Sequence, residues 1–219
     1  MCDYEYLQQE GYSFTYVFAG LGKEANPPRF AFENNWANAK QAGLLRGAYY
    51  SLTYGNADAQ AQEFISRLEK DPGELPPVVD LESHYFLPDE RPTNKTKREN
   101  CDTVIAEVTK VLTNIEAKLG KKPMLYLSKN VWSEAFCNSD KLKQYSIWVV
   151  WVPDGITVPL PWGTGKLVKD PVKIKQQGWA LWQNNDNQDI ALISKNTCID
   201  YSVYNGSTKD LLKSYSTLK

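Results

Sequence analysis

Two kinds of hydrophobic spacing alternate along the chain. One is a short run rich in β-branched and aromatic residues, which is typical of a buried strand. Such runs occupy residues 14–20, 44–52, 76–82, 123–128, 146–152 and 178–183, with a shorter β-like element at 198–201. The other is a segment in which apolar residues recur every three or four positions, as on the buried face of an amphipathic helix. Glycine often ends such a segment. These predicted helices are 3–10, 30–42, 61–68, 104–119, 131–136 and 207–215.

This alternation of strands and helices predicts a mostly parallel sheet with helical crossovers. A doubly wound sheet and a closed barrel both fit the pattern. We find no interdomain linker or internal repeat, so residues 1–219 are expected to form a single domain.

Polar side chains collect where the predicted strands end. Asp80 and Glu82 end one strand, Tyr126 and Ser128 another, and Gln183 a third. In both candidate folds the carboxyl ends of parallel strands meet at one edge, where binding and catalysis are found. The sequence therefore predicts one cleft that contains these side chains.

The two carboxylates of the segment PPVVDLE are the strongest candidates for chemistry. In a strand, side chains two residues apart point to the same face, so Asp80 and Glu82 should both enter the cleft while Leu81 packs behind them. Repulsion and desolvation in such a pair raise one pKa and leave the other group charged. A proton donor beside a charged stabiliser is what glycosidic cleavage requires. A solvated loop after the strand is the alternative interpretation.

Aromatic residues are abundant, with seven Trp and thirteen Tyr. Core packing explains many of them, but flat sugar faces also pack well on Trp and Tyr rings. The formal net charge of -1 and the lack of a basic stripe argue against nucleic acid as a partner. No apolar run approaches the ~20 residues of a spanning helix, so we expect no membrane insertion.

The cysteines and the histidine give little support for a metal or other cofactor, and we expect none. The four cysteines are scattered without a CxxC pair, which favours free thiols. His84 is the single histidine and is expected in a loop near the site.

Several segments, in order, resemble the family 25 glycoside hydrolases, the muramidases of phage endolysins, bacteria and some fungi. The most recognisable is LPPVVDLE, which resembles the family strand that ends in an acid pair. The other matching segments are GYSFTYVFAGLG, NNWANAKQAGLLRGAYYSL, KKPMLYLSKNVW, SIWVVWV, and WALWQ followed by CIDYSVYNG.

The resemblance implies an irregular (β/α) TIM-like barrel with late antiparallel strands. It implies hydrolysis of the β-1,4 bond between N-acetylmuramic acid and N-acetylglucosamine in peptidoglycan glycan strands. Glu82 matches the general acid, Asp80 its partner, and Asp200 a further acid of the cleft, although Asp200 also fits a strand-end cap. The residues expected to line the sugar groove are Tyr50, Tyr126, Trp148, Trp151, Trp182 and Gln183.

The chain also departs from the family pattern. Family members begin with a strand reading G-I-D-V-S, whereas Met1 here directly precedes what resembles the following helix, so we expect the first strand and its acid to be missing. Residues 18–22, FAGLG, stand where the family often has K-A-T-E-G, and Tyr50 stands at a usual His.

These departures keep other functions open. A non-catalytic wall- or glycan-binding protein that retains the fold is one alternative, and a chitinase-like glycosidase is another. We expect a monomer. No secretory signal is visible, so a phage-encoded enzyme is expected in the host cytoplasm before release to the wall, and otherwise a non-classical export route.

Overall fold

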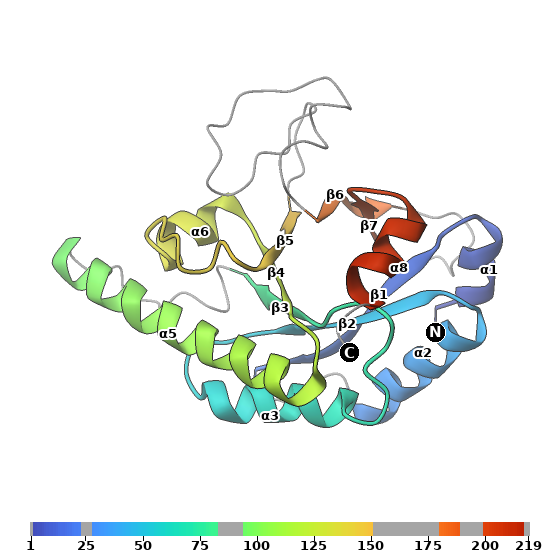
Figure 1. Cartoon of the computed structure of the whole chain (residues 1–219), viewed down its shortest axis with the longest axis horizontal. Coiled ribbons are helices and arrows are strands. Elements are labelled where there is room, and N and C mark those ends of the chain that lie inside the picture. Colours follow the sequence, from blue (N-terminus) through green and yellow to red (C-terminus); the bar gives the residue numbers. More distant parts are fainter. Residues whose placement is uncertain (1, 23–27, 83–93, 151–179, 189–198, 217–219) are drawn as a thin grey trace, which may run out of the picture.

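The computed structural model describes residues 2–22, 28–82, 94–150, 180–188 and 199–216. Strands and helices alternate through most of this part of the chain (Figure 1). The strands are β1 (Phe14–Leu21), β2 (Leu45–Ser51), β3 (Val78–Leu81), β4 (Met124–Leu127), β5 (Ser146–Val150), β6 (Leu181–Gln188) and β7 (Ile199–Tyr204). The helices are α1 (Tyr4–Gln9), α2 (Arg29–Gln41), α3 (Ala57–Leu68), α5 (Asn94–Leu119), α6 (Lys129–Ala135) and α8 (Thr208–Ser216).

The strands form one seven-stranded sheet in sequential order from β1 to β7. Pairing is parallel from β1 to β6, and β7 runs antiparallel to β6. The sheet curls into a half-barrel, which confirms the predicted irregular barrel with a late antiparallel strand. Within the described residues, β1 and β7 each pair on one side only, so they are the two edges of the sheet.

Alternation along the strands separates two apolar layers. On β3, Val79 and Leu81 belong to the large core between the sheet and helices α2, α3 and α5. Val78 instead packs on the concave side, in a cluster with Met124 and Trp148. Because successive side chains of a strand point to opposite faces, this parity decides which residues reach the inside of the curled sheet.

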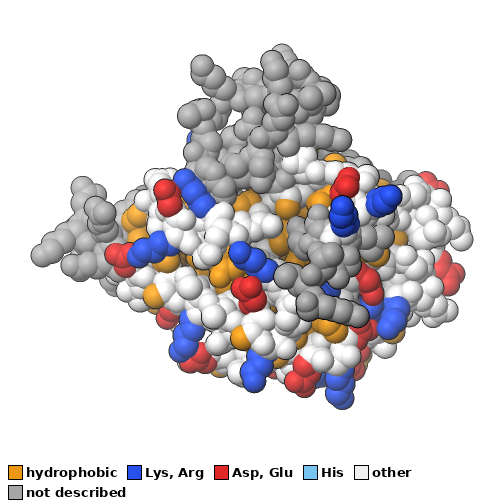
Figure 2. All heavy atoms as spheres, viewed as in Figure 1, with side chains coloured by type: hydrophobic (Ala, Val, Ile, Leu, Met, Phe, Trp, Pro, Cys, Tyr) orange, Lys and Arg blue, Asp and Glu red, His pale blue; other side chains and the backbone are white. Residues whose placement is uncertain are grey.

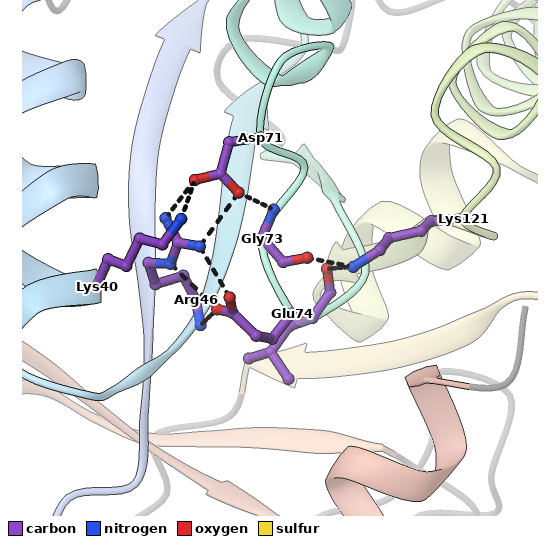
Figure 3. Close-up of polar contacts among 7 residues, drawn as sticks. Lys40, Arg46, Asp71, Gly73, Glu74 and Lys121 are labelled. Carbon is purple, nitrogen blue, oxygen red and sulfur yellow. Dashed lines mark hydrogen bonds and ion pairs between the residues drawn. The ribbon is translucent and has the colours of Figure 1, made fainter. Parts of the chain in front are cut away.

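A charged network closes the amino end of the sheet (Figure 3). Arg46 of β2 is 1% exposed and bonds both Asp71 and Glu74, which lie in the connection between α3 and β3. Its guanidinium also lies 4.6 Å from the centre of the Trp36 ring. Lys121, just before β4, donates to the carbonyl oxygen of Gly73 over 2.5 Å. The network joins α2, β2 and the entrances of β3 and β4.

The prediction of free thiols is wrong for two of the cysteines. Cys101 of α5 and Cys137, just after α6, form a disulfide with a Cα–Cα distance of 6.0 Å. They are far apart in sequence, and the packing of α6 on α5 brings them within the range that a disulfide spans. Cys2 is free, and Cys198 lies outside the described residues.

Helices α5 and α6 begin earlier than the sequence predicts. Helix α5 begins at Asn94, well before the predicted start at residue 104. Helix α6 begins after Ser128, whose side-chain oxygen accepts from the backbone N–H of Val131 over 3.3 Å. Ser128, expected at the cleft, therefore serves as an N-cap.

The surface carries charges of both signs. Figure 2 shows Lys and Arg side chains interspersed with Asp and Glu over the described part of the face in view. In the part of the chain that the structure describes, no helix is long and apolar enough to cross a membrane.

Candidate active site

A cavity of about 800 Å³ occupies the concave side of the half-barrel. Residues from all seven strands or from the ends of those strands line it, together with α1, α2 and α8. Consecutive residues of the two edge strands, 14–16 of β1 and 202–204 of β7, are among them. A strand turns only alternate side chains to one face, so consecutive lining residues show that the strand edges themselves border the cavity.

Asp80 and Glu82 both line this cavity, as the two-residue spacing predicts. Asp80 is the third residue of β3, and Glu82 follows the last residue of that strand. Leu81, between them, is buried in the core between the sheet and the helices. The carboxyl pair therefore lies at the carboxyl end of a central parallel strand, where barrel enzymes place their chemistry.

Asp80 is buried, with 5% of the residue exposed. Its register partner on β2 is Ser51, whose hydroxyl donates to Oδ2 of Asp80. The other carboxyl oxygen, Oδ1, is buried and has no hydrogen-bond partner among the described residues. Burial raises the pKa of Asp80 from 3.8 to about 7, assisted by the charge of Glu82 and opposed by the Ser51 hydrogen bond. The raised pKa thus belongs to Asp80, which the resemblance matches to the partner of the general acid.

An aromatic surface adjoins the carboxyl pair. Tyr126 of β4 and Trp148 of β5 line the cavity, and their ring centres lie 5.3 Å apart. The ring centre of Tyr16, on β1, lies 4.8 Å from that of Trp148. Gly47 makes room for Tyr16, because a Cβ at that position would lie 2.1 Å from the tyrosine ring. Gln183 also lines the cavity and is 5% exposed, as predicted for the polar end of its strand.

Two of the predicted groove residues do not line the cavity. Tyr50 is 2% exposed, packs on Phe64 of α3, and donates its hydroxyl to the carbonyl oxygen of Gly22. Trp182 packs against the core between the sheet and the helices. Both predictions fail for the same reason. Successive side chains of a strand point to opposite faces, and each of these two side chains points towards the helices and away from the cavity.

The neighbours of Tyr50 on β2 occupy the cavity instead. Tyr49 and Ser51 both line it, and neither was predicted as a site residue. The run LLRGAYYSL is apolar on both faces, so its sequence alone does not show which parity points inward. The pairing of Ser51 with Asp80 supplies that information.

Three of the expected residues cannot be placed in the cavity. Asp200 lies on β7, but its side chain is outside the described part of the structure. Trp151 and His84 lie outside the described residues altogether. Among the residues that are described, no group of three or more His, Cys, Asp or Glu side chains is arranged to hold a metal ion.

A curled parallel sheet with a carboxyl pair in an aromatic cavity at its carboxyl end is an arrangement found in barrel-type glycosidases. The family model described as "Glycosyl hydrolases family 25" matches residues 1–192. The chain therefore belongs to glycosyl hydrolases family 25.

The chain is also similar in sequence to a curated protein. The uncharacterized protein YegX of Escherichia coli strain K12 is 24% identical over 199 residues, which are 90% of this chain and 61% of YegX. The chain thus spans about three-fifths of the length of that relative.

Among solved structures, the bacterial lysozyme from Streptomyces coelicolor superposes with a TM-score of 0.73 at 21% identity, covering 99% of this chain and 92% of that one. The muramidase from Trichobolus zukalii gives a TM-score of 0.71 at 20% identity, covering 97% and 91%. A family 25 glycosyl hydrolase from Bacillus anthracis gives 0.71 at 23% identity, covering 97% and 87%. These likenesses show a shared fold.

Proposed function

We propose that this protein is a peptidoglycan hydrolase that cleaves the β-1,4 bond between N-acetylmuramic acid and N-acetylglucosamine. The observation that carries the proposal is the placement of Asp80 and Glu82 together in an aromatic cavity at the carboxyl end of β3. Family membership supports the reaction class, and the muramidase and lysozyme among the similar structures support the substrate class.

Glu82 is proposed as the general acid. It is half-buried at the end of β3 and shares the cavity with an aromatic surface on which a sugar ring can lie. In the first step, Glu82 gives its proton to the glycosidic oxygen as the bond to the anomeric carbon breaks. In the second step it accepts a proton from the water that attacks the same carbon.

Asp80 is proposed as the partner that orients the substrate. In this proposal the acetamido oxygen of the substrate bonds to the anomeric carbon as the glycosidic bond breaks, and that new bond breaks in turn when water attacks the carbon. The acetamido N–H donates to the Asp80 carboxylate throughout. The Oδ1 atom of Asp80 is a buried acceptor without a hydrogen-bond partner among the described residues. An N–H group of the substrate would satisfy this atom, which would otherwise cost about 1–3 kcal/mol.

The disulfide bears on where the protein acts. Disulfides persist in oxidising compartments and are rare in the cytosol. The bond between Cys101 and Cys137 favours action outside the cytosol, at the cell wall. We retain as proposals an endolysin-type role, a monomeric state and peptidoglycan glycan strands as the partner.

The decisive experiment adds the purified protein to Gram-positive cell walls and follows their clearing. The wild type should clear them, Glu82→Gln should not, and Glu33→Gln should match the wild type because Glu33 is an exposed residue in a surface ion pair. Analysis of the new reducing ends should find them on N-acetylmuramic acid. Binding without clearing would reject the enzyme in favour of a glycan-binding protein, and new ends on glucosamine would indicate a chitinase-like glycosidase.

A further inference from the structure

Ser51 and Asp80 are held side by side by the backbone as well as by their side chains. The N–H of Leu52 donates to the carbonyl oxygen of Asp80 over 2.9 Å, and the N–H of Gly22 donates to the carbonyl oxygen of Ser51 over 2.9 Å. These bonds fix Ser51 from both neighbouring strand ends. With 6% of Ser51 exposed, its hydroxyl has little room to turn away from the carboxyl group.

The hydrogen bond makes the two carboxyl oxygens of Asp80 unequal. Oδ2 accepts from the Ser51 hydroxyl, whereas Oδ1 has no hydrogen-bond partner among the described residues. Both Asp80 and Ser51 line the cavity. A carboxyl group held at one oxygen cannot rotate about its terminal bond without losing that hydrogen bond. Oδ1 is therefore the oxygen left for a ligand.

We propose that Ser51 is a positioning residue, which holds Oδ2 of Asp80 so that Oδ1 accepts the acetamido N–H of the substrate. This inference rests on the proposed function, in which Asp80 orients that group. It adds Ser51 as the residue that sets the orientation of the Asp80 carboxyl group. It also assigns different tasks to the two oxygens of that group.

A consequence for the proton follows from the same arrangement. With Oδ2 engaged as an acceptor, a proton on Asp80 resides on Oδ1, and Oδ1 then can no longer accept from the substrate. The charged form is therefore the competent one. The Ser51 hydrogen bond lowers the pKa of Asp80, against burial and the negative charge of Glu82. On the neighbouring strands β2 and β4, the titratable side chains that line the cavity are the phenols of Tyr49 and Tyr126, and no Lys or Arg is among the described residues that line it.

The test compares wild type, Ser51→Ala and Ser51→Thr. The Asp80 carboxyl carbon is followed by NMR in protein labelled with [13C]aspartate, and Asp80→Asn assigns the signal. We expect Ser51→Ala to raise the pKa of Asp80 by about one unit, the size expected for a lost hydrogen bond to a charged group. Ser51→Thr keeps the hydroxyl and should restore the wild-type titration. Thermal unfolding confirms that each variant is folded.

Kinetics on cell walls supply the second readout. In Ser51→Ala the acid limb of the kcat profile should move to higher pH, and kcat below the new pKa should fall about tenfold with a small change in KM. An unchanged Asp80 titration would overturn the inference, and so would a shifted titration with unchanged kcat at every pH. If Asp80 titrates as expected but the wild type clears no walls, the proposed function fails, and the catalytic part of this inference fails with it. The control of the Asp80 pKa by Ser51 would then still stand.

Discussion

Nη1 of Arg46 lies 2.9 Å from Oδ2 of Asp71 at the amino end of the sheet, opposite the end that carries Asp80. Arg46 compensates its burial with ion pairs to two carboxylates. Among the described residues that line its cavity, Asp80 has no cation as a neighbour, and the other charged group is the like charge of Glu82. The amino end of the barrel is thus built for stability and the carboxyl end for chemistry, which is the usual division in barrel enzymes.

The Asp80 carboxyl group should reduce the stability of the fold at neutral pH. Its pKa is raised from 3.8 to about 7 in the folded protein, so the folded state binds the proton more tightly than the unfolded chain. Stability should therefore fall as pH rises from about 4 to about 7. We predict that Asp80→Asn is inactive on cell walls yet more stable than wild type at pH 8, by on the order of 2 kcal/mol.

Urea unfolding at pH 4 and pH 8 checks this prediction. Near pH 4 the two proteins should differ little, since Asp80 is protonated in the folded wild type and carries no charge to be buried. A stability difference of the same size at both pH values would contradict the assignment of the effect to the Asp80 charge.

Asp71 should have the opposite pH dependence. Its hydrogen bond to Arg46 holds its pKa at about 2, below the ordinary 3.8, so the stabilisation is present above pH 4 and is lost as pH falls towards 2. Because the Asp71 side chain is 38% exposed, solvent screens the pair, and we expect Asp71→Asn to cost only about 1 kcal/mol at pH 7.

Chemical denaturation between pH 2 and pH 7 measures this effect. Asp58→Asn is the matched control, because its ion pair with Lys110 is more exposed on both sides and should contribute less. The Asp71 prediction fails if the loss of stability in Asp71→Asn does not shrink on acidification.

The neighbouring tyrosines of β2 should separate substrate binding from stability. Tyr49 lines the cavity, so Tyr49→Ala should raise KM about fivefold through the lost aromatic contact. Tyr50→Phe should leave KM unchanged and cost about 1 kcal/mol, since the carbonyl oxygen of Gly22 loses its donor. Steady-state kinetics and thermal unfolding of both variants test the pair. A larger KM effect at Tyr50 than at Tyr49 would show that Tyr50, and not Tyr49, faces the substrate.

The disulfide should be a major contributor to stability. Cys101 and Cys137 enclose a loop with a sequence separation of 36, for which loop-closure entropy gives roughly 3–4 kcal/mol. We predict that the Cys101→Ser, Cys137→Ser double variant has a lower melting temperature than the oxidised wild type. Reduction should lower the melting temperature of the wild type by a similar amount and leave that of the double variant unchanged. An equal response of both proteins to the reductant would exclude the disulfide as the cause.

The sequence by itself determined the order of the elements and the position of the acid pair. The alternation of strand-like and helical runs predicts a barrel or doubly wound sheet, because each pattern reports the local environment of the backbone. Asp80 and Glu82 are predicted to share a face because the two-residue period is a local property of a strand. Gln183, Tyr126 and Trp148 also line the cavity, and their role in sugar binding stays a prediction.

Only the tertiary structure decided which parity of each remaining strand faces the cavity and which distant residues meet. Tyr50 lies on a strand that carries apolar residues on both faces, so the sequence pattern does not show which face points into the cavity. The register of β2 against β3 is what brings Ser51 to Asp80 and turns Tyr49 inward. The Cys101–Cys137 bond likewise depends on how α6 packs on α5. These features are long-range pairings, and a local periodicity cannot specify them.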